Sequence, residues 1–119
     1  MLDDTSIWIE YFRSHNNDLA ALLSGCQVLM HPYVLGELAC GNLANRAEIL
    51  QLMGALPQAP AATDKEVRYF IEQHALMGKG IGYIDVHLLA SVALHGSTMI
   101  WTRDKRLNNA AETLSMAYH

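Results

Sequence analysis

The sequence predicts a small α/β domain, a three-layer α/β/α sandwich in which helices cover both faces of a small central parallel sheet. Short apolar runs that suit buried strands alternate along the chain with segments of helical periodicity, and this alternation is typical of parallel sheets. A length of 119 residues favours a single domain over residues 1–119. Apolar residues make up 51% of the chain and charged residues 17%, so the composition favours a well-buried core.

The N-terminal part is expected to hold a very short first strand, over residues 1–3, followed by two helices and a second strand. Apolar side chains recur at helical spacing over residues 5–13. A second short helix is expected over residues 18–23, closed by Gly25. The run QVLM, residues 27–30, then suits a short buried strand.

Proline, glycine and asparagine set the limits of the next elements. Pro32 suits the first turn of a helix over residues 31–40, and Gly41 stops that helix. Asn45 is expected to cap a helix that runs to residue 53. Residues 55–62 carry two prolines, so we expect a connection there with room for one short edge strand.

The C-terminal half continues the alternation of helices and strands. A glycine-rich loop separates its first two helices, and the second of these is strongly apolar and ends at Gly96. The expected elements are a helix over 64–76, the loop over 77–83, the apolar helix over 85–95, a strand over 98–101, a helix over 104–114 and a last strand over 116–118.

Composition and charge exclude several classes of protein. No apolar run approaches the roughly 18 residues of a membrane span, and Asp3 and Asp4 stand where a secretory signal would be basic. We therefore expect a cytoplasmic protein without a membrane segment. Cys26 and Cys40 lack metal-ligand spacing and are expected to be reduced core thiols. A net charge of −4 counts against a generic nucleic-acid coat protein.

Four acidic residues occupy related positions in this predicted fold. Asp4 follows the first strand, Asp104 follows the strand over 98–101, and Asp85 begins the apolar helix. Because parallel strands end at one edge of a sheet, where ligands bind, these three side chains should point toward one rim. Glu37 lies one to two turns into its helix and can lean over the same edge. We expect the four carboxylates to converge.

Helix capping is an alternative explanation for three of these four acids. Aspartate is a preferred helix N-cap, so capping alone would explain Asp4, Asp85 and Asp104. Glu37 resists that account because it lies within a helix, as the only Asp, Glu, Lys or Arg between residues 27 and 45. A carboxylate buried without a partner is costly or becomes protonated. A neutral buried glutamate or a distant arginine partner stays an alternative, but a cation from outside the chain explains Glu37 better.

Oxygen ligands without cysteine or a required histidine suit Mg²⁺ or Mn²⁺, which also removes the repulsion among clustered acids. Such a cation commonly serves hydrolysis of phosphodiesters, where it activates water and stabilises charge on the phosphate oxygens. Thr5, Ser6 and Thr102 flank the acids. They could orient the water or a phosphate, although hydroxyl residues at a helix start are more often caps.

These residues together resemble a PIN domain of the VapC toxin type. The resemblance spans nearly the whole chain and depends on four motifs in order: DTS at residues 4–6, HPYVLGELACG with Glu37, GIGYIDVHLLAS with Asp85, and WTRDKRL with Thr102 and Asp104. It implies an Mg²⁺- or Mn²⁺-dependent endoribonuclease whose catalytic and metal-binding residues are Asp4, Glu37, Asp85 and Asp104. It also implies a cognate VapB-type antitoxin, whose C-terminal segment wraps the toxin, and a homodimer.

Two positions depart from the family pattern. Asp3 stands where the family usually has an apolar residue, so its contribution to the site is open. Arg106 stands where many PIN domains have another acid. One tightly held ion, with a second arriving with the substrate, is therefore the expectation.

A local basic rim is expected to attract RNA to this acidic chain, and the alternative is an ordinary solvated helix start. The residues of that rim are Lys79, Arg103, Lys105 and Arg106. His31, His87 and His95 are expected to be core or surface residues. Trp8, Tyr11 and Phe12 suit either the core or an antitoxin segment. The substrate is expected to be an unpaired loop of a structured RNA.

Two other functions stay open at this point. A receiver-type phosphoacceptor domain also begins with paired acids, as in LDDTS, but it would need a further aspartate after its third strand, where LPQAPAAT carries none. A catalytically inactive PIN-like interaction module would keep the fold without the chemistry. The presence of all four acids argues against that module.

Overall fold

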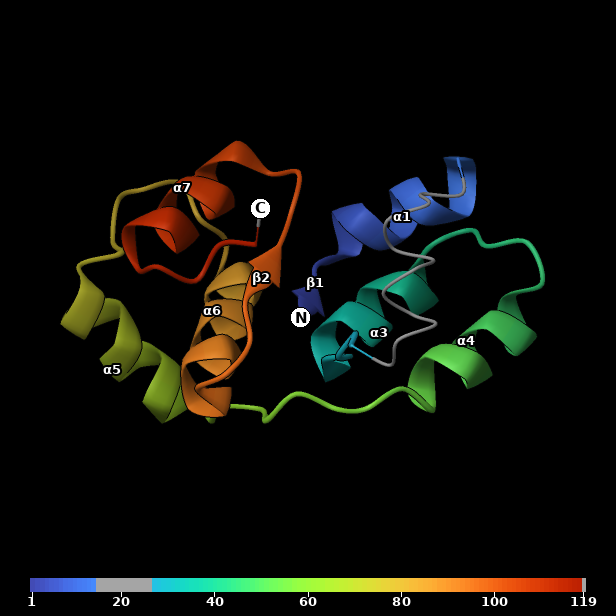
Figure 1. The fold of residues 1–119 in the computed structure, drawn as a ribbon, viewed down its shortest axis with the longest axis horizontal. Helices are drawn as coiled ribbons and strands as arrows, with labels where there is room; N and C mark the ends of the chain where they lie inside the picture. Colours follow the sequence, from blue (N-terminus) through green and yellow to red (C-terminus); the bar gives the residue numbers. More distant parts are fainter. Residues whose placement is uncertain (15–26, 119) are drawn as a thin grey trace.

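Two very short parallel strands form the centre of the fold. The structure is a computed structural model, which describes residues 1–14 and 27–118. Strands β1 (Leu2–Asp3) and β2 (Ile100–Trp101) pair in parallel, with Leu2 opposite Ile100 and Asp3 opposite Trp101. They lie in the middle of the molecule, with the amino terminus beside them (Figure 1).

Three further segments extend this pair on both sides. Single parallel bridges join Leu29 to Leu2, Met30 to Gln58, and Ala117 to Ile100. Main-chain hydrogen bonds join these segments to the two strands. The amide of Leu29 donates to the carbonyl of Met1 at 2.7 Å, and the amide of Ile100 donates to the carbonyl of Met116 at 2.8 Å. The predicted α/β class with a small parallel sheet is confirmed. The outer strands predicted over 27–30 and 116–118 are bridge segments instead of full strands.

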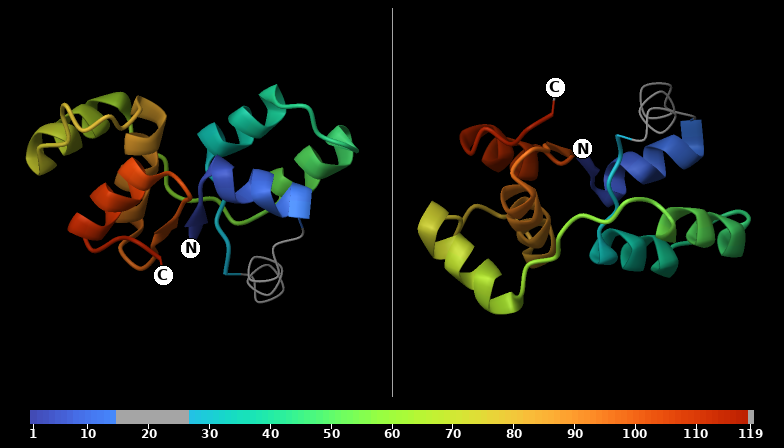
Figure 2. Two further views of the ribbon diagram at one scale, coloured as in Figure 1. Left: turned by 90° about the horizontal axis from the view of Figure 1, so that it is seen from above. Right: turned by 60° about the horizontal axis from the view of Figure 1, so that its bottom comes forward.

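The described helices gather at the two sides of this sheet. Helices α1, α3 and α4 lie on the β1 side, and α5, α6 and α7 lie on the β2 side, as Figure 1 and Figure 2 show. The helix expected over 18–23 falls outside the described residues. The bounds are α1 Thr5–Ser14, α3 Pro32–Cys40, α4 Arg46–Gly54, α5 Asp64–His74, α6 Tyr83–His95 and α7 Lys105–Thr113.

The helix starts correct two sequence predictions. Asn45 precedes α4 in a left-handed conformation, φ 53°, and its side chain makes no capping bond. Helix α6 begins two residues before the predicted start, with Gly82 at its N-cap, so Asp85 lies inside the first turn and caps nothing. Helix α5 has a full capping box, in which Thr63 and Glu66 exchange bonds at 2.9 and 3.1 Å.

The core lies between the sheet and the helices, and α6 runs through it. Residues 86–92 of α6 are all buried, because α5 and β2 pack against this helix. Cys40 is exposed, so the prediction of a core thiol is wrong there, and Cys26 lies outside the described residues. No helix in the described ranges is long and apolar enough to cross a membrane. The largest fully buried side chains include Trp8, Leu2, Ile7, Met30, Leu38, Leu88, Leu89, Ile100 and Leu107.

Asp3 occupies a strand position that the core would normally give to an apolar side chain. It has no exposed surface, and both carboxylate oxygens lack a hydrogen-bond partner among the described residues. Burial raises the pKa of Asp3 to about 8, the charge of Asp4 adds to this shift, and the N-terminal ammonium opposes it. The folded chain therefore keeps this carboxyl protonated at neutral pH.

Replacing Asp3 with valine should stabilise the fold, and the gain should grow with pH. The pKa of Asp3 rises from 3.8 to about 8 on folding, so folding takes up a proton and the stability of the native chain falls as pH rises through that window. Asp3 should contribute a slope of roughly 1 kcal/mol per pH unit, and Asp3→Val should remove that contribution, most clearly between about pH 6 and 8, above the pKa of Asp85. Denaturant unfolding at several pH values, in a chelator, measures this.

The matched control is Asp3→Asn, which cannot ionise but leaves a polar group without partners. It should share the shallower pH profile of Asp3→Val at a lower free energy of unfolding. A slope between about pH 6 and 8 that stays as steep as in the wild-type protein in both variants would contradict this account of Asp3.

Candidate active site

Asp4 lies where the two strands end, and donors from both strand ends surround it. It is 5% exposed. Its Oδ2 accepts a hydrogen bond from the hydroxyl of Thr102, which follows β2. Its Oδ1 accepts from the hydroxyl of Ser6 and, at 3.3 Å, from the amide of Ile7 in α1. The carboxylate of Asp4 is thus held in one orientation at the carboxyl edge of the sheet.

The same hydroxyl groups connect Asp4 to the start of α7. Thr102 Oγ1 accepts from the amide of Asp104 at 3.0 Å while it donates to Asp4. Ser6 Oγ accepts from the amide of Arg103 at 3.0 Å. Asp104 is itself exposed, and its Oδ1 caps α7 by accepting from the amide of Leu107 at 3.0 Å. Asp4 and Asp104 therefore do serve as helix caps, and Thr102 also links the carboxylate of Asp4 to the backbone amide of Asp104.

Glu37 reaches the same region from α3, although the reason for singling it out was wrong. It is exposed, so it carries no cost of a carboxylate buried in an apolar segment. Its Oε1 accepts a hydrogen bond from the hydroxyl of Thr5 at 2.7 Å, and Thr5 directly follows Asp4. The described residues include no ion pair to Glu37. The contact with Thr5 brings α3 to the start of α1.

The pKa of Asp85 is raised by burial and by the negative charges of the other three acids. It is partly buried in the first turn of α6. Burial raises the pKa of Asp85 to about 6, and the negative charges of Asp4, Asp104 and Glu37 raise it further in that order. Burial also raises the pKa of Asp4, against the bonds from Ser6 and Thr102 that lower it. Carboxylates from four separate elements therefore lie within electrostatic reach of one another.

The donor chemistry suits a hard divalent cation, but the side chains do not form a closed cage. Among the described residues, no three of the His, Cys, Asp and Glu side chains stand close enough to bind one ion together. The expectation that one small ion bridges all four acids directly is therefore not met. A magnesium-sized ion keeps several waters and needs only one or two direct carboxylates. Burial and then the neighbouring negative charges raise the pKa of Asp85, and such an ion would relieve the repulsion among these charges.

The predicted basic rim is divided between two places. Arg103 makes a two-pronged ion pair with Glu10, at 2.7 and 2.9 Å, and lies over the ring of Trp101. The side chain of Arg106 packs on Gly80, where an added Cβ would stand 2.7 Å from Nη1. Arg106 and Lys79 line one small hollow of about 240 Å³. Lys105 is exposed at the start of α7.

The histidines stay outside the group of acids, as the sequence predicted. His87 is buried, and its Nε2 lies 3.1 Å from Oδ1 of Asp64. His31 caps α3 by accepting from the amide of Tyr33 at 3.0 Å. Burial and the neighbouring His87 lower the pKa of His31 to about 4, so its ring is neutral. His95 is exposed at the end of α6.

Sequence reasoning missed two tyrosines that contact the buried ring of His87. Tyr33 and Tyr83 both contact the ring of His87, with centroids 4.7 and 4.8 Å away. The two tyrosines come from α3 and α6, the helices that carry Glu37 and Asp85. The signal available in the sequence was their spacing, since Tyr33 precedes Glu37 by one helical turn and Tyr83 precedes Asp85 by two residues.

Comparison with known proteins identifies the family of this chain. A family model described as "PIN domain" matches residues 1–113. Ribonuclease VapC32 from two Mycobacterium tuberculosis strains, CDC 1551 / Oshkosh and ATCC 25618 / H37Rv, is 41% identical over 117 residues in each case. These alignments cover 98% of this chain and 94% of each relative. The chain belongs to the PIN domain family, and within that family to its VapC-type members.

Proposed function

We propose that this chain is the toxin of a toxin–antitoxin pair, an endoribonuclease that hydrolyses RNA phosphodiester bonds with a divalent cation at its acids. The observation that carries this function is the carboxylate of Asp4 at the ends of β1 and β2, held by the hydroxyls of Thr102 and Ser6, with Glu37 bonded to the adjacent Thr5. Membership in the PIN family and the ribonuclease name of the VapC32 relatives support the same reaction.

PIN ribonucleases use a divalent metal ion, and the all-oxygen donor set here favours Mg²⁺ or Mn²⁺. The bound ion supplies positive charge that stabilises the charge developing on the phosphate. Asp4 is the fixed ligand in this proposal, because Thr102 and Ser6 hold its carboxylate. Asp85, Asp104 and Glu37 would complete the site, directly or through water. Thr5 orients Glu37 through the bond at 2.7 Å.

RNA would approach over the charged rim of this edge. Lys79 and Arg106, which line one hollow, are the proposed phosphate contacts, together with Lys105, which is exposed at the start of α7. Arg103 forms an ion pair with Glu10, so its proposed role is to hold the structure of the basic rim. An unpaired loop of a structured RNA is the proposed substrate, because splayed strands offer both phosphate and base faces to such a rim.

A groove between α1, α3 and α4 offers a seat for a segment of the VapB-type antitoxin. Its volume is about 870 Å³. Tyr11 and Phe12 line it, and Glu37 borders it, so a basic side chain of the bound segment could reach the acids. Trp8 is fully buried in the core and takes no part in this surface.

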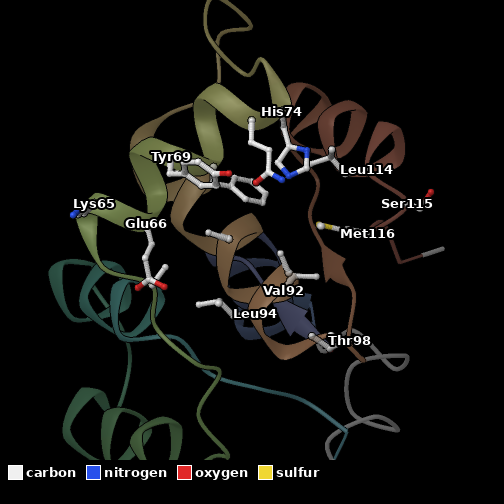
Figure 3. A pocket seen from close by; sticks show the side chains of 16 residues that line it. Lys65, Glu66, Tyr69, His74, Val92, Leu94, Thr98, Leu114, Ser115 and Met116 are labelled. Atoms are coloured by element: carbon white, nitrogen blue, oxygen red, sulfur yellow. The ribbon is translucent and has the colours of Figure 1, made fainter.

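A homodimer is also part of the proposal. A second groove, of about 820 Å³, runs between α5, α6 and the segment after α7. Figure 3 shows Val92, Leu94 and Met116 around it. Leu94 is 51% exposed, and an exposed apolar surface of this kind favours a covered interface.

The comparisons bear differently on the two alternative functions, a receiver-type phosphoacceptor and a catalytically inactive PIN-like module. The receiver-type phosphoacceptor has no support from the PIN family match or from the VapC32 relatives. A catalytically inactive module would keep the same fold, so only an assay of cleavage separates it from the proposed enzyme.

Removing a central carboxylate should abolish metal-dependent cleavage of single-stranded RNA. Asp4→Asn and Asp85→Asn should each lower the rate by about a hundred-fold or more, because each loses a negative ligand for the cation. EDTA should stop the wild-type reaction, and added Mg²⁺ or Mn²⁺ should restore it. The control Glu48→Gln removes an exposed acid in the first turn of α4 and should cleave normally. Cleavage that persists in both asparagine variants would come from another site or another protein.

Thr102 should act by positioning Asp4. Thr102→Val keeps the shape of the side chain but removes the hydroxyl that joins Asp4 to the amide of Asp104. Cleavage should fall about 10- to 100-fold, with a higher Mg²⁺ requirement, which is the usual cost of losing a partner that orients a metal ligand. Thr102→Ser should recover most of the rate. Equal Mg²⁺ requirements in the valine and wild-type proteins would contradict this role.

A further inference from the structure

Two exposed tyrosine rings flank the buried ring of His87. Tyr33 at the start of α3 is 40% exposed, and Tyr83 at the start of α6 is 44% exposed. The ring of His87 lies between these two helices and contacts both tyrosines, at 4.7 Å and 4.8 Å between centroids. Two aromatic surfaces that are far apart in the sequence are thus brought to one place.

Polar contacts hold these rings in position. The hydroxyl of Tyr83 donates to Oδ1 of Asp64 at 2.9 Å, and Nε2 of His87 lies 3.1 Å from the same oxygen. The ring of Tyr33 also packs edge-on against His31, at 5.3 Å between centroids. Rings that are already fixed lose little conformational entropy when a ligand stacks on them.

Tyr33 brings this aromatic pair near one of the proposed site carboxylates. Tyr33 and Glu37 are one turn apart on α3 and therefore share a face of that helix. Tyr83 lies in the first turn of α6, two residues before Asp85, so these two side chains point to different faces of the helix. The link to the acids is through Tyr33 and Glu37. A ligand that places a phosphate at the acids can reach these rings with its neighbouring group.

Packing alone does not account for both tyrosines. Covering His87 requires only the ring edges that face it, yet both rings keep a large exposed surface. Among the grooves of the described residues, neither the α1–α3–α4 groove nor the α5–α6 groove includes Tyr33 or Tyr83. The exposed faces therefore form a surface separate from those proposed for the antitoxin and for a second copy.

We propose that Tyr33 and Tyr83 form a stacking site for an unpaired RNA base that flanks the cleaved phosphate. This inference rests on the proposed ribonuclease function and adds a substrate contact to it. The occupant follows from continuity with the acids, since a single-stranded RNA carries a flat base next to every phosphate. Aromatic stacking accepts every base, so these residues would strengthen binding at one position of the strand without reading its sequence.

The first test compares cleavage of a mixed-sequence single-stranded RNA oligonucleotide by leucine and phenylalanine variants. Tyr33→Leu and Tyr83→Leu should each raise KM about ten-fold and leave kcat within a few-fold, because a stacking contact binds substrate without touching the reacting atoms. Tyr33→Phe and Tyr83→Phe keep the ring and should recover most of the affinity. Met77→Ala, which removes an exposed apolar side chain in the loop before α6, should leave KM unchanged.

The second test locates the stacked base. In oligonucleotides with a single abasic position, wild-type protein should lose affinity most at one position next to the cleavage site. The leucine variants should be insensitive to that same abasic position, because both changes remove one contact. Thermal unfolding of each variant checks that it folds.

The outcomes separate the two proposals. If wild-type protein does not cleave RNA, the proposed function fails. If it cleaves and the leucine variants keep the wild-type KM, only the stacking site is overturned. Leucine variants that bind RNA normally but lose the antitoxin would likewise overturn it and assign the tyrosines to a protein partner.

Discussion

The parallel pairing of β1 with β2 is the contact on which the rest of the structure depends. Each strand has two residues, and the pairing ends with the amide of Asp4 donating to the carbonyl of Trp101 at 3.0 Å. The next residues along both strands, Asp4 and Thr102, then meet through a side-chain bond across 98 positions of sequence. The sheet that closes the fold therefore also assembles the site, because the same few residues perform both tasks.

Placing acids at this edge opposes folding of the metal-free chain. Burial and three neighbouring negative charges raise the pKa of Asp85 to about 6, and burial raises that of Asp4. The hydroxyl bonds of Ser6 and Thr102 offset part of this cost at Asp4. In the proposed function a divalent cation offsets more of it, so binding of the ion and stability of the fold are coupled.

Local patterns predicted most of the fold, and tertiary contacts decided the rest. Helical periodicity and Pro32 predicted α1 and α3 closely, because those signals lie within the helices themselves. The outer strands could not be delimited in the same way, since a bridge such as Leu2 with Leu29 depends on its partner. Residues 18–23 are outside the described chain, and that prediction stays untested.

In the candidate site, too, some features followed from the sequence and others depended on tertiary contacts. Chain order and the rule that ligands bind where parallel strands end predicted that Asp4 and the segment of Asp104 lie at one edge of the sheet, and Thr102 links the carboxylate of Asp4 to the amide of Asp104 there. The exposure of Glu37 was misjudged because an apolar neighbourhood in sequence says little about which helix face meets water. The aromatic contacts around His87 join α3 to α6, and no local pattern reports such a contact.

Binding of Mn²⁺ to the metal-free chain, measured by calorimetry, tests most directly whether the four acids share one cation site. Wild-type protein should bind Mn²⁺ saturably, and Asp4→Asn or Asp85→Asn should weaken that binding by about ten-fold or more, whereas Glu48→Gln should not. Mn²⁺ binding that is absent in wild-type protein, or equally strong in the two asparagine variants, would contradict a shared site at the carboxyl ends of β1 and β2.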